Sequence, residues 1–209
     1  MFKLNKKMKT NIGMTYVELI VVLSIFSVLS SIVLFNYGEF QSKVDLKNLA
    51  SDIALKIVEA QKASLSGKLP LAGHSVTSDW KPSYGVHFDI TPGTGDNQKL
   101  IYFVDQDAIG VLQNNLFDGS FSECTGECLE EISITKGDYI SAINKIISGV
   151  SSPVDDLTVT FSRINSGMVF ASGSALLSNT VSSIEITITS PKSTNVIIKL
   201  YPSGRIELK

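Results

Sequence analysis

The chain has 209 residues, of which 44% are hydrophobic and 18% are charged, and its formal net charge is −2. This length accommodates one ordinary domain with an appendage and excludes two large independent cores. The composition excludes general disorder. The part after residue 13 holds all 20 acidic residues and 14 of the 18 basic ones, so it gives no general electrostatic attraction to nucleic acid or anionic lipid.

The N-terminus combines a short basic segment with a long uncharged one. Residues 1–13 contain no acidic residue. Their basic residues are Lys3, Lys6, Lys7 and Lys9. The following uncharged stretch, Leu19 to Gly38, is long enough at 1.5 Å per residue to cross most of a bilayer core, so a transmembrane helix is expected over about residues 19–38. Because the lysines precede it, the N-terminus is expected in the cytoplasm and the C-terminal part outside.

A single acidic residue, Glu18, stands at the start of the apolar stretch. A carboxylate carried to the middle of a bilayer costs roughly 2.5 to 3.5 kcal/mol, and acids in such positions tend to be functional and to have a partner. The run Gly13-Met14-Thr15-Tyr16-Val17-Glu18-Leu19, between a basic leader and a long apolar segment, resembles the class III leader of type IV prepilins and pseudopilins.

This resemblance implies a processing site and an assembly contact. A prepilin peptidase would cut between Gly13 and Met14 on the cytoplasmic face, and Met14 would be N-methylated. Glu18 would then pair with the α-amine of Met14 in a neighbouring subunit. An α-amine has a pKa of about 7.7 to 8.0 and is therefore largely cationic at neutral pH. The alternative is an uncleaved signal anchor in which Glu18 marks the membrane interface.

Residues 39–66 keep a helical period, with apolar residues at steps of three and four and charged residues on the opposite face. Together with the apolar stretch they predict one helix from Met14 to Ser66, ended by Gly67 and Pro70, with a possible bend at Gly38.

Beyond Gly67 the pattern changes to short alternating segments broken by Gly, Pro, Ser and Asn, which is typical of strands. The expected strands are Tyr84–Ile90, Lys99–Val104, Leu129–Thr135, Leu157–Arg163, Met168–Ala171, Ser183–Thr189, Asn195–Tyr201 and Arg205–Leu208. One short helix is expected over Asp138–Ser148, with Asp138 as its cap and Gly149 as its stop. The predicted class is α+β, with a long N-terminal helix packed on an exported antiparallel sheet domain of residues 67–209.

This second part resembles the GspH/FimT subgroup of minor pilins and pseudopilins. The residues that carry the resemblance are Tyr84-Gly85-Val86-His87-Phe88, Tyr102-Phe103-Val104-Asp105, Val159-Thr160-Phe161 with Gly167, and Gly204-Arg205-Ile206. Some members bind DNA through a C-terminal Gly-Arg-x-Arg. Here Glu207 replaces the second arginine, so nucleic acid is not an expected partner.

Cys124 and Cys128 frame a small loop, and an exported domain lies where disulfides persist, so a local disulfide is expected. Two free thiols or half of a metal site are the alternatives. Zinc needs about four ligands, and the only histidines, His74 and His87, are far away in sequence. His87 lies in an alternating strand and is expected at the surface or half-buried.

No enzymatic activity, metal or cofactor is expected from the remaining polar residues. Asp105 and Asp107 begin a calcium-loop pattern, but Leu116 stands where its twelfth position needs an acid. Nucleotide-binding glycine loops and serine-histidine-aspartate arrangements do not occur in the sequence.

The predicted function is a structural subunit of a type IV pilus or a related secretion pseudopilus, most similar to a minor or initiating pilin. The resemblance implies other pilin subunits, a prepilin peptidase and an inner-membrane assembly platform as partners. It also implies a single-pass location in the cytoplasmic membrane before assembly into an extracellular or periplasmic filament. The alternatives are a major pilin, a single-span adhesin that never polymerises, and a DNA-uptake protein.

Overall fold

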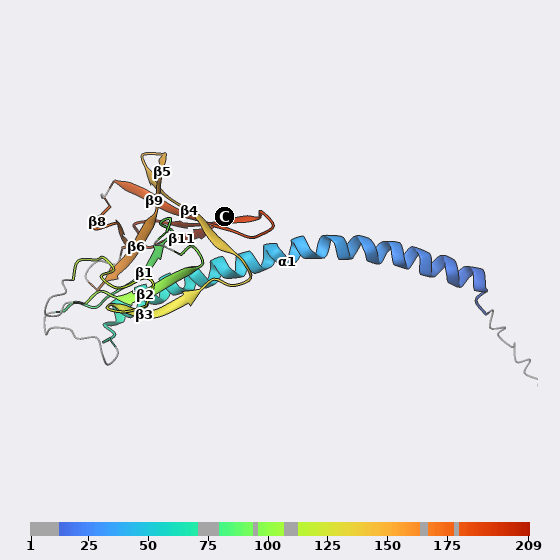
Figure 1. The fold of residues 1–209 in the computed structure, drawn as a ribbon, viewed down its shortest axis with the longest axis horizontal. Helices are drawn as coiled ribbons and strands as arrows, with labels where there is room; N and C mark the ends of the chain where they lie inside the picture. Colours follow the sequence, from blue (N-terminus) through green and yellow to red (C-terminus); the bar gives the residue numbers. More distant parts are fainter. Residues whose placement is uncertain (1–12, 71–79, 94–95, 107–112, 164–166, 178–179) are drawn as a thin grey trace, which may run out of the picture. The chain divides into compact units, whose positions relative to one another are not determined.

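The computed structural model describes residues 13–70, 80–93, 96–106, 113–163, 167–177 and 180–209. The chain divides into two compact units, Met1–Gln41 and Ser42–Lys209. Helix α1 (Tyr16–Ser66) contributes its first half to one unit and its second half to the other. The predicted α+β class, with one long N-terminal helix and antiparallel sheets, is confirmed (Figure 1).

Helix α1 continues through Gly38 without interruption and ends at Ser66. Gly67 follows it with a left-handed φ of 69°, a conformation that costs a glycine little. The amide of Gly67 donates to Ser64 O at 3.2 Å and the amide of Lys68 donates to Ala63 O at 3.1 Å. This pair of bonds is a Schellman motif, which satisfies carbonyls that the end of a helix leaves free.

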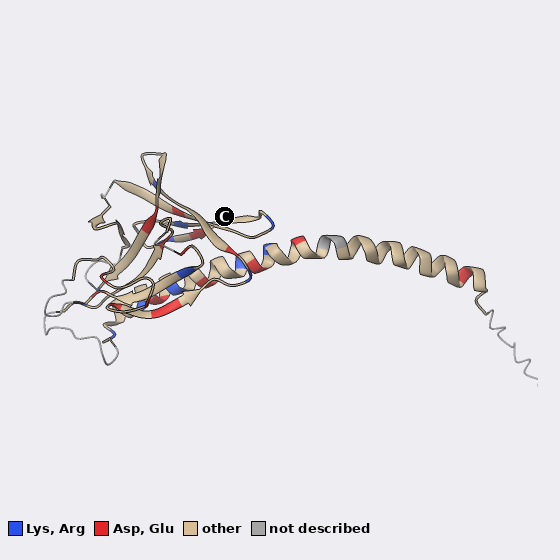
Figure 2. Cartoon of the chain, viewed as in Figure 1, with Lys and Arg blue, Asp and Glu red and all other residues tan. Residues whose placement is uncertain are grey.

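In the first unit, α1 is apolar on all sides. Its large apolar side chains between Val17 and Leu34 are 46% to 74% exposed. A helix that is hydrophobic all round is stable in contact with lipid or with other apolar helices, and not in water. Figure 2 shows the contrast along the helix: the first half is nearly free of charged residues, whereas acidic and basic residues alternate over the second half.

Among the described residues, the second unit contains two antiparallel sheets. The six-stranded sheet has the order β3-β2-β1-β6-β7-β8. Its strands are β1 (Ser83–Asp89), β2 (Lys99–Val104), β3 (Cys128–Ser133), β6 (Asp156–Ser162), β7 (Val169–Ser172) and β8 (Ala175–Leu176). The five-stranded sheet has the order β11-β10-β9-β4-β5. Its strands are β4 (Tyr139–Ile147), β5 (Val150–Val154), β9 (Val181–Thr189), β10 (Asn195–Leu200) and β11 (Ile206–Leu208).

The predicted strands have counterparts here, with bounds that differ by no more than two residues. The predicted helix over Asp138–Ser148 is wrong, because these residues form strand β4, which pairs with β9 and β5. Its isoleucines are β-branched and fit a pleated surface better than a helix. Gly149 does not end a helix. With Ser148 it forms a two-residue hairpin turn in which both φ angles are positive, 49° and 83°. Strands β5 and β8 were not predicted.

The main core joins the second half of α1 to both sheets. The buried apolar residues of α1 recur at helical spacing on one face. They are Leu46, Ala50, Ile53, Ile57, Ala60 and Ala63. Gly85 in β1 pairs with Phe103, and a Cβ at Gly85 would lie 2.6 Å from the Phe103 ring. The absence of a side chain at Gly85 therefore lets that ring lie against the strand.

One polar residue of α1 enters the sheet itself. Ser64 is fully buried, and its Oγ donates to Phe161 O at 2.6 Å and accepts from the Tyr84 amide at 3.0 Å. Tyr84 and Phe161 are partners in the β1–β6 register. The hydroxyl thus bridges two backbone groups and fixes α1 against the six-stranded sheet.

Replacement of Ser64 by alanine is expected to lower the free energy of unfolding by about 1–3 kcal/mol, because it leaves a buried amide and a buried carbonyl without their partner. Chemical unfolding of the full chain in detergent micelles, followed by Trp80 fluorescence, measures this change. Ser51→Ala is the matched control, since Ser51 is exposed and bonds only its own helix, and should change stability by less than about 0.5 kcal/mol. An equal effect of the two substitutions would contradict the role of Ser64.

Candidate functional site

The predicted processing and assembly residues lie at the start of the described chain. Gly13, Met14 and Thr15 precede the helix, and α1 begins at Tyr16, two residues later than predicted. Glu18 is in the first turn and is exposed. These residues are therefore adjacent. Glu18 lies in the turn whose backbone amides have no hydrogen-bond partner within the helix.

Thr15 and Glu18 form a reciprocal cap at this end of α1. The Thr15 amide and hydroxyl donate to Glu18 Oε2 at 3.3 and 3.2 Å, and the Glu18 amide donates to Thr15 Oγ1 at 3.3 Å. The first helical bond, from the Leu19 amide to Thr15 O, is 3.1 Å long. This is a capping box, which satisfies two amides that would otherwise face an apolar environment.

The cap changes what Glu18 can do. Sequence reasoning left its carboxylate without a partner inside its own chain, whereas the structure gives it one in Thr15. Both bonds use Oε2, and within the described part of the chain Oε1 has no hydrogen-bond partner. The carboxylate can therefore cap its own helix with one oxygen and accept a cation from another molecule with the other. The threonine three residues before a glutamate was the signal that identifies this cap in a sequence.

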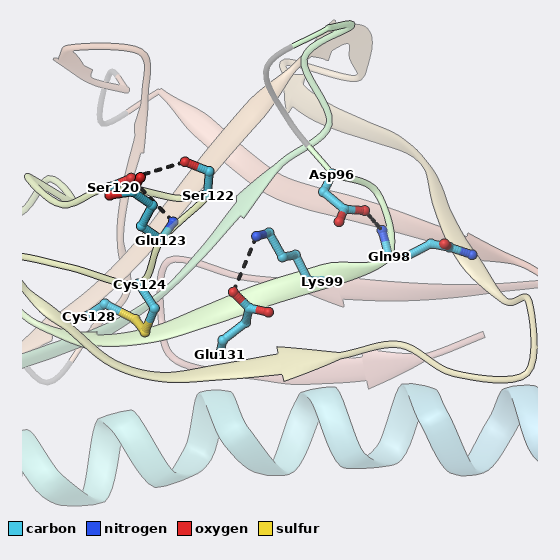
Figure 3. Close-up of polar contacts among 9 residues, drawn as sticks. All are labelled: Asp96, Gln98, Lys99, Ser120, Ser122, Glu123, Cys124, Cys128 and Glu131. Atoms are coloured by element: carbon cyan, nitrogen blue, oxygen red, sulfur yellow. Dashed lines mark hydrogen bonds and ion pairs between the residues drawn. A yellow bond between two sulfur atoms is a disulfide. The ribbon is translucent and has the colours of Figure 1, made fainter.

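A second group of polar residues lies between β2 and β3. Cys124 and Cys128 form the expected disulfide, with Cα atoms 5.1 Å apart (Figure 3). Around it, Phe117 and Phe121 pack with Ile101 and Phe103 into a small apolar cluster separate from the main core. We call residues 113–128 the cap segment.

His87 lies under the cap segment and is 8% exposed, so the expectation of a surface or half-buried side chain is wrong. Its ring is 4.9 Å from the Phe117 ring and 5.5 Å from the Phe121 ring, and its Nδ1 is 2.8 Å from Thr158 Oγ1. Burial lowers the pKa of His87 to about 4, although the carboxylates of Asp156 and Asp89 act in the opposite direction. The ring is therefore neutral and structural at neutral pH.

Two buried carboxylates hold the backbone of the cap segment. Asp105 is fully buried and accepts the amides of Asn114 at 3.2 Å and Asn115 at 2.9 Å. Glu127 is 1% exposed and accepts the amides of Gln106 at 2.7 Å and Asp118 at 2.9 Å. The sequence placed Asp105 only in an incomplete calcium-loop pattern and assigned no role to Glu127, since nothing in the pattern of a loop marks a buried acid.

Burial raises the pKa of both Asp105 and Glu127 to about 7, while their backbone hydrogen bonds act in the opposite direction. The negative charge of Asp118 also raises both pKa values. These groups do not form a metal site: among the described residues, no cluster of three or more histidine, cysteine, aspartate or glutamate residues could hold a metal ion. His74 and Asp107 lie outside the described residues.

Arg205, the remaining arginine of the expected C-terminal motif, is engaged by its neighbours. Its Nη1 is 3.2 Å from Glu207 Oε1, and its Cζ is 3.9 Å from the centroid of the Tyr201 ring. Tyr201 in turn donates its hydroxyl to Glu207 at 2.8 Å. Arg205 and Glu207 therefore form a largely exposed ion pair that Tyr201 joins on both sides.

Comparisons of this chain with models of known protein families, with curated proteins and with solved structures find no match. The molecule itself has one described helix, α1, that is long and apolar enough to cross a membrane, with a mean hydropathy of 2.5 over its most apolar window. Length and composition alone support this, and the helix lies near the N-terminus, where signal sequences have the same properties.

Replacement of Thr15 by alanine should weaken the first turn of α1 by about 1 kcal/mol, the usual effect of losing an N-cap, and so speed amide exchange there about fivefold. Glu18→Gln should leave that exchange nearly unchanged, because glutamine also serves in a capping box. Amide exchange of the full chain in detergent micelles, measured by NMR, gives both results. If the amides of the first turn exchange no faster in Thr15→Ala than in the unsubstituted chain, the cap does not stabilise this turn.

The two buried carboxylates predict a pH-dependent stability. In the folded protein they hold their protons up to about pH 7, compared with ordinary pKa values of 3.8 and 4.5. Their contribution to stability is therefore complete below about pH 4 and is lost as the pH rises through 7. The free energy of unfolding should fall by up to about 1.4 kcal/mol per pH unit for each group in this range.

Unfolding curves at several pH values, read from Trp80, test this dependence. Trp80 is a suitable reporter because its Nε1 donates to Asp105 O at 2.7 Å. The double variant Asp105→Asn and Glu127→Gln should lose most of the slope. A slope that persists in this variant would assign the pH dependence to other groups.

Proposed function

We propose that this chain is a type IV pilin-like subunit, anchored in a membrane by the first half of α1 until that half packs with the helices of other subunits in a filament. The observation that carries the proposal is an apolar helix with a single carboxylate in its first turn, whose large apolar side chains between Val17 and Leu34 are 46% to 74% exposed. The second unit would form the exposed surface of the filament.

The exposed helix supports assembly because its apolar side chains need a non-aqueous environment. An apolar helix leaves a bilayer at low cost only if other helices replace the lipid. A subunit that moves from membrane to filament exchanges one such environment for the other. A helix that served only as an anchor needs the lipid alone, and its Glu18 would serve only as the helix cap.

The carboxylate supports a contact between subunits. After cleavage between Gly13 and Met14, the α-amine of Met14 would be a cation at the start of the same apolar helix. Oε1 of Glu18 would accept the amine of a neighbouring subunit while Oε2 keeps the helix cap. Each charge would then be neutralised where burial in an apolar bundle makes an unpaired charge costly.

Within the pilin class we propose a minor or initiating role, on the resemblance of the sheet domain to the GspH/FimT subgroup. The pairing of Arg205 with Glu207 argues against DNA capture as the role of this residue. Mass spectrometry of sheared filaments distinguishes a minor from a major pilin by copy number, since a major pilin would be the dominant protein.

The cap and the charge of Glu18 are tested separately by a matched pair of variants. Glu18→Gln keeps the helix cap and removes the charge, so the proposal expects it to accumulate in the membrane and to be lost from sheared filaments. Thr15→Ala removes the cap and keeps the charge, and is expected to assemble. Both fractions are quantified by immunoblotting of cells that produce the full chain.

The mature N-terminus is measured on the same material, and a start at N-methylated Met14 is expected. A chain that begins at Met1, or after the apolar helix, would rule out the proposed processing. Normal filament levels of Glu18→Gln would reduce Glu18 to a helix cap and favour the single-span adhesin.

A further inference from the structure

The cap segment, residues 113–128, differs from the rest of the second unit in how it is held. Its backbone pairs with β2 only at its last two described residues: the Val104 amide donates to Glu127 O at 3.1 Å, and Cys128 pairs with Phe103. Over residues 113–126 the backbone pairing in the described structure is an isolated bridge between Ser120 and Thr125, which lies within the segment. The strands around it form continuous ladders, β1 with β2 and β2 with β3. The attachment of residues 113–126 therefore depends on side chains.

These attachments are of three kinds. The buried carboxylate of Asp105 accepts the amides of Asn114 and Asn115, and that of Glu127, within the segment, accepts the amide of Gln106 outside it. The rings of Phe117 and Phe121 pack on His87, and the Phe117 ring is also 5.3 Å from the Phe103 ring. The disulfide joins Cys124 to Cys128, which is both the last residue of the cap segment and the first residue of β3 (Figure 3).

The disulfide is the attachment that ties the tip of the cap segment to the sheet. Cys124 is partly exposed and has a positive φ of 47°, a conformation that a cysteine rarely adopts. Cys128 is 7% exposed and belongs to the same apolar cluster as Ile101 and Phe103. Without the bond, the tip loses its covalent link to this cluster and the strained residue is free to relax.

The cluster under the cap segment is separate from the main core. Ile101 and Phe103 are fully buried, and their neighbours in β2, Leu100 and Tyr102, belong to the main core on the other face of the sheet. Opening the cap segment would expose this small cluster and leave the main core covered. The second unit can therefore change locally without unfolding.

We propose that the cap segment is a redox-controlled lid: the Cys124–Cys128 disulfide closes it over β1 and β2, and reduction opens it while both sheets remain folded. A dithiol supplies two electrons and two protons, the sulfur–sulfur bond becomes two thiols, and the dithiol leaves as a disulfide. The reverse exchange with an oxidised dithiol protein closes the lid. The lid is thus open in a reducing compartment and closed in an oxidising one.

Hydrogen–deuterium exchange of the full chain in detergent micelles, with and without dithiothreitol, tests the lid. Reduction should speed exchange of peptides from residues 113–128 roughly 30-fold, the change that the chain-entropy model gives for so small a closed loop. Peptides from β4, β9 and β10 should not change. The intact mass of the chain reports whether the bond has been reduced.

A variant carrying Cys124→Ser and Cys128→Ser should show the open pattern without reductant, and dithiothreitol should cause no further change in it. Phe117→Ala should open the same peptides with the disulfide intact, because it removes the ring that packs on His87 and Phe103. Unchanged exchange in the cap segment after reduction would overturn the lid. Equal acceleration in β4, β9 and β10, or failure of the serine variant to fold, would also overturn it by showing that the cap segment is not separable.

This inference does not rest on the proposed filament. If the cap segment opens on reduction but the chain never polymerises, the lid proposal holds and the pilin proposal fails. If the chain assembles into filaments but reduction does not change the cap segment, the pilin proposal holds and the lid proposal fails.

Discussion

The organisation of this protein depends on one constraint: the first half of α1 presents apolar side chains that water does not tolerate. Between Val17 and Leu34 its large apolar side chains are 46% to 74% exposed, and at roughly 25 cal/mol per Å² of apolar surface such exposure to water is very unfavourable. A helix of this kind is stable in lipid or against other apolar helices. The second half of the same helix has the opposite property, because its apolar face is fully used by the sheets.

A continuous helix therefore has two environments with different requirements. In the second half, the buried apolar face packs in the main core, and Ser64 adds hydrogen bonds to the backbone of two buried strands. In the first half, the Thr15–Glu18 cap satisfies amides that the start of the helix leaves free.

Periodicity was sufficient to predict the long helix, its end at Ser66 and most strands, because these elements have one apolar face and well-marked ends. It failed at β4, where Ile140, Ile143, Ile146 and Ile147 fit a helix by spacing. Pairing with β9, a contact between segments about 40 residues apart, overrides that local pattern. Buried polar groups were missed for the same reason: Ser64, Asp105 and Glu127 acquire their partners only through the tertiary fold.

The two apolar clusters of the second unit explain why a small disulfide can matter here. A bond that closes so few residues adds little to the stability of a whole domain, since its entropic effect grows with loop length. It has a large local effect when the segment that it ties down has almost no backbone pairing and covers its own cluster. The buried acids strengthen this dependence, because each must give up solvation when the segment closes. The free energy of opening the cap segment is therefore a small difference between opposing contributions. The main core, which α1 and both sheets share, costs far more free energy to open.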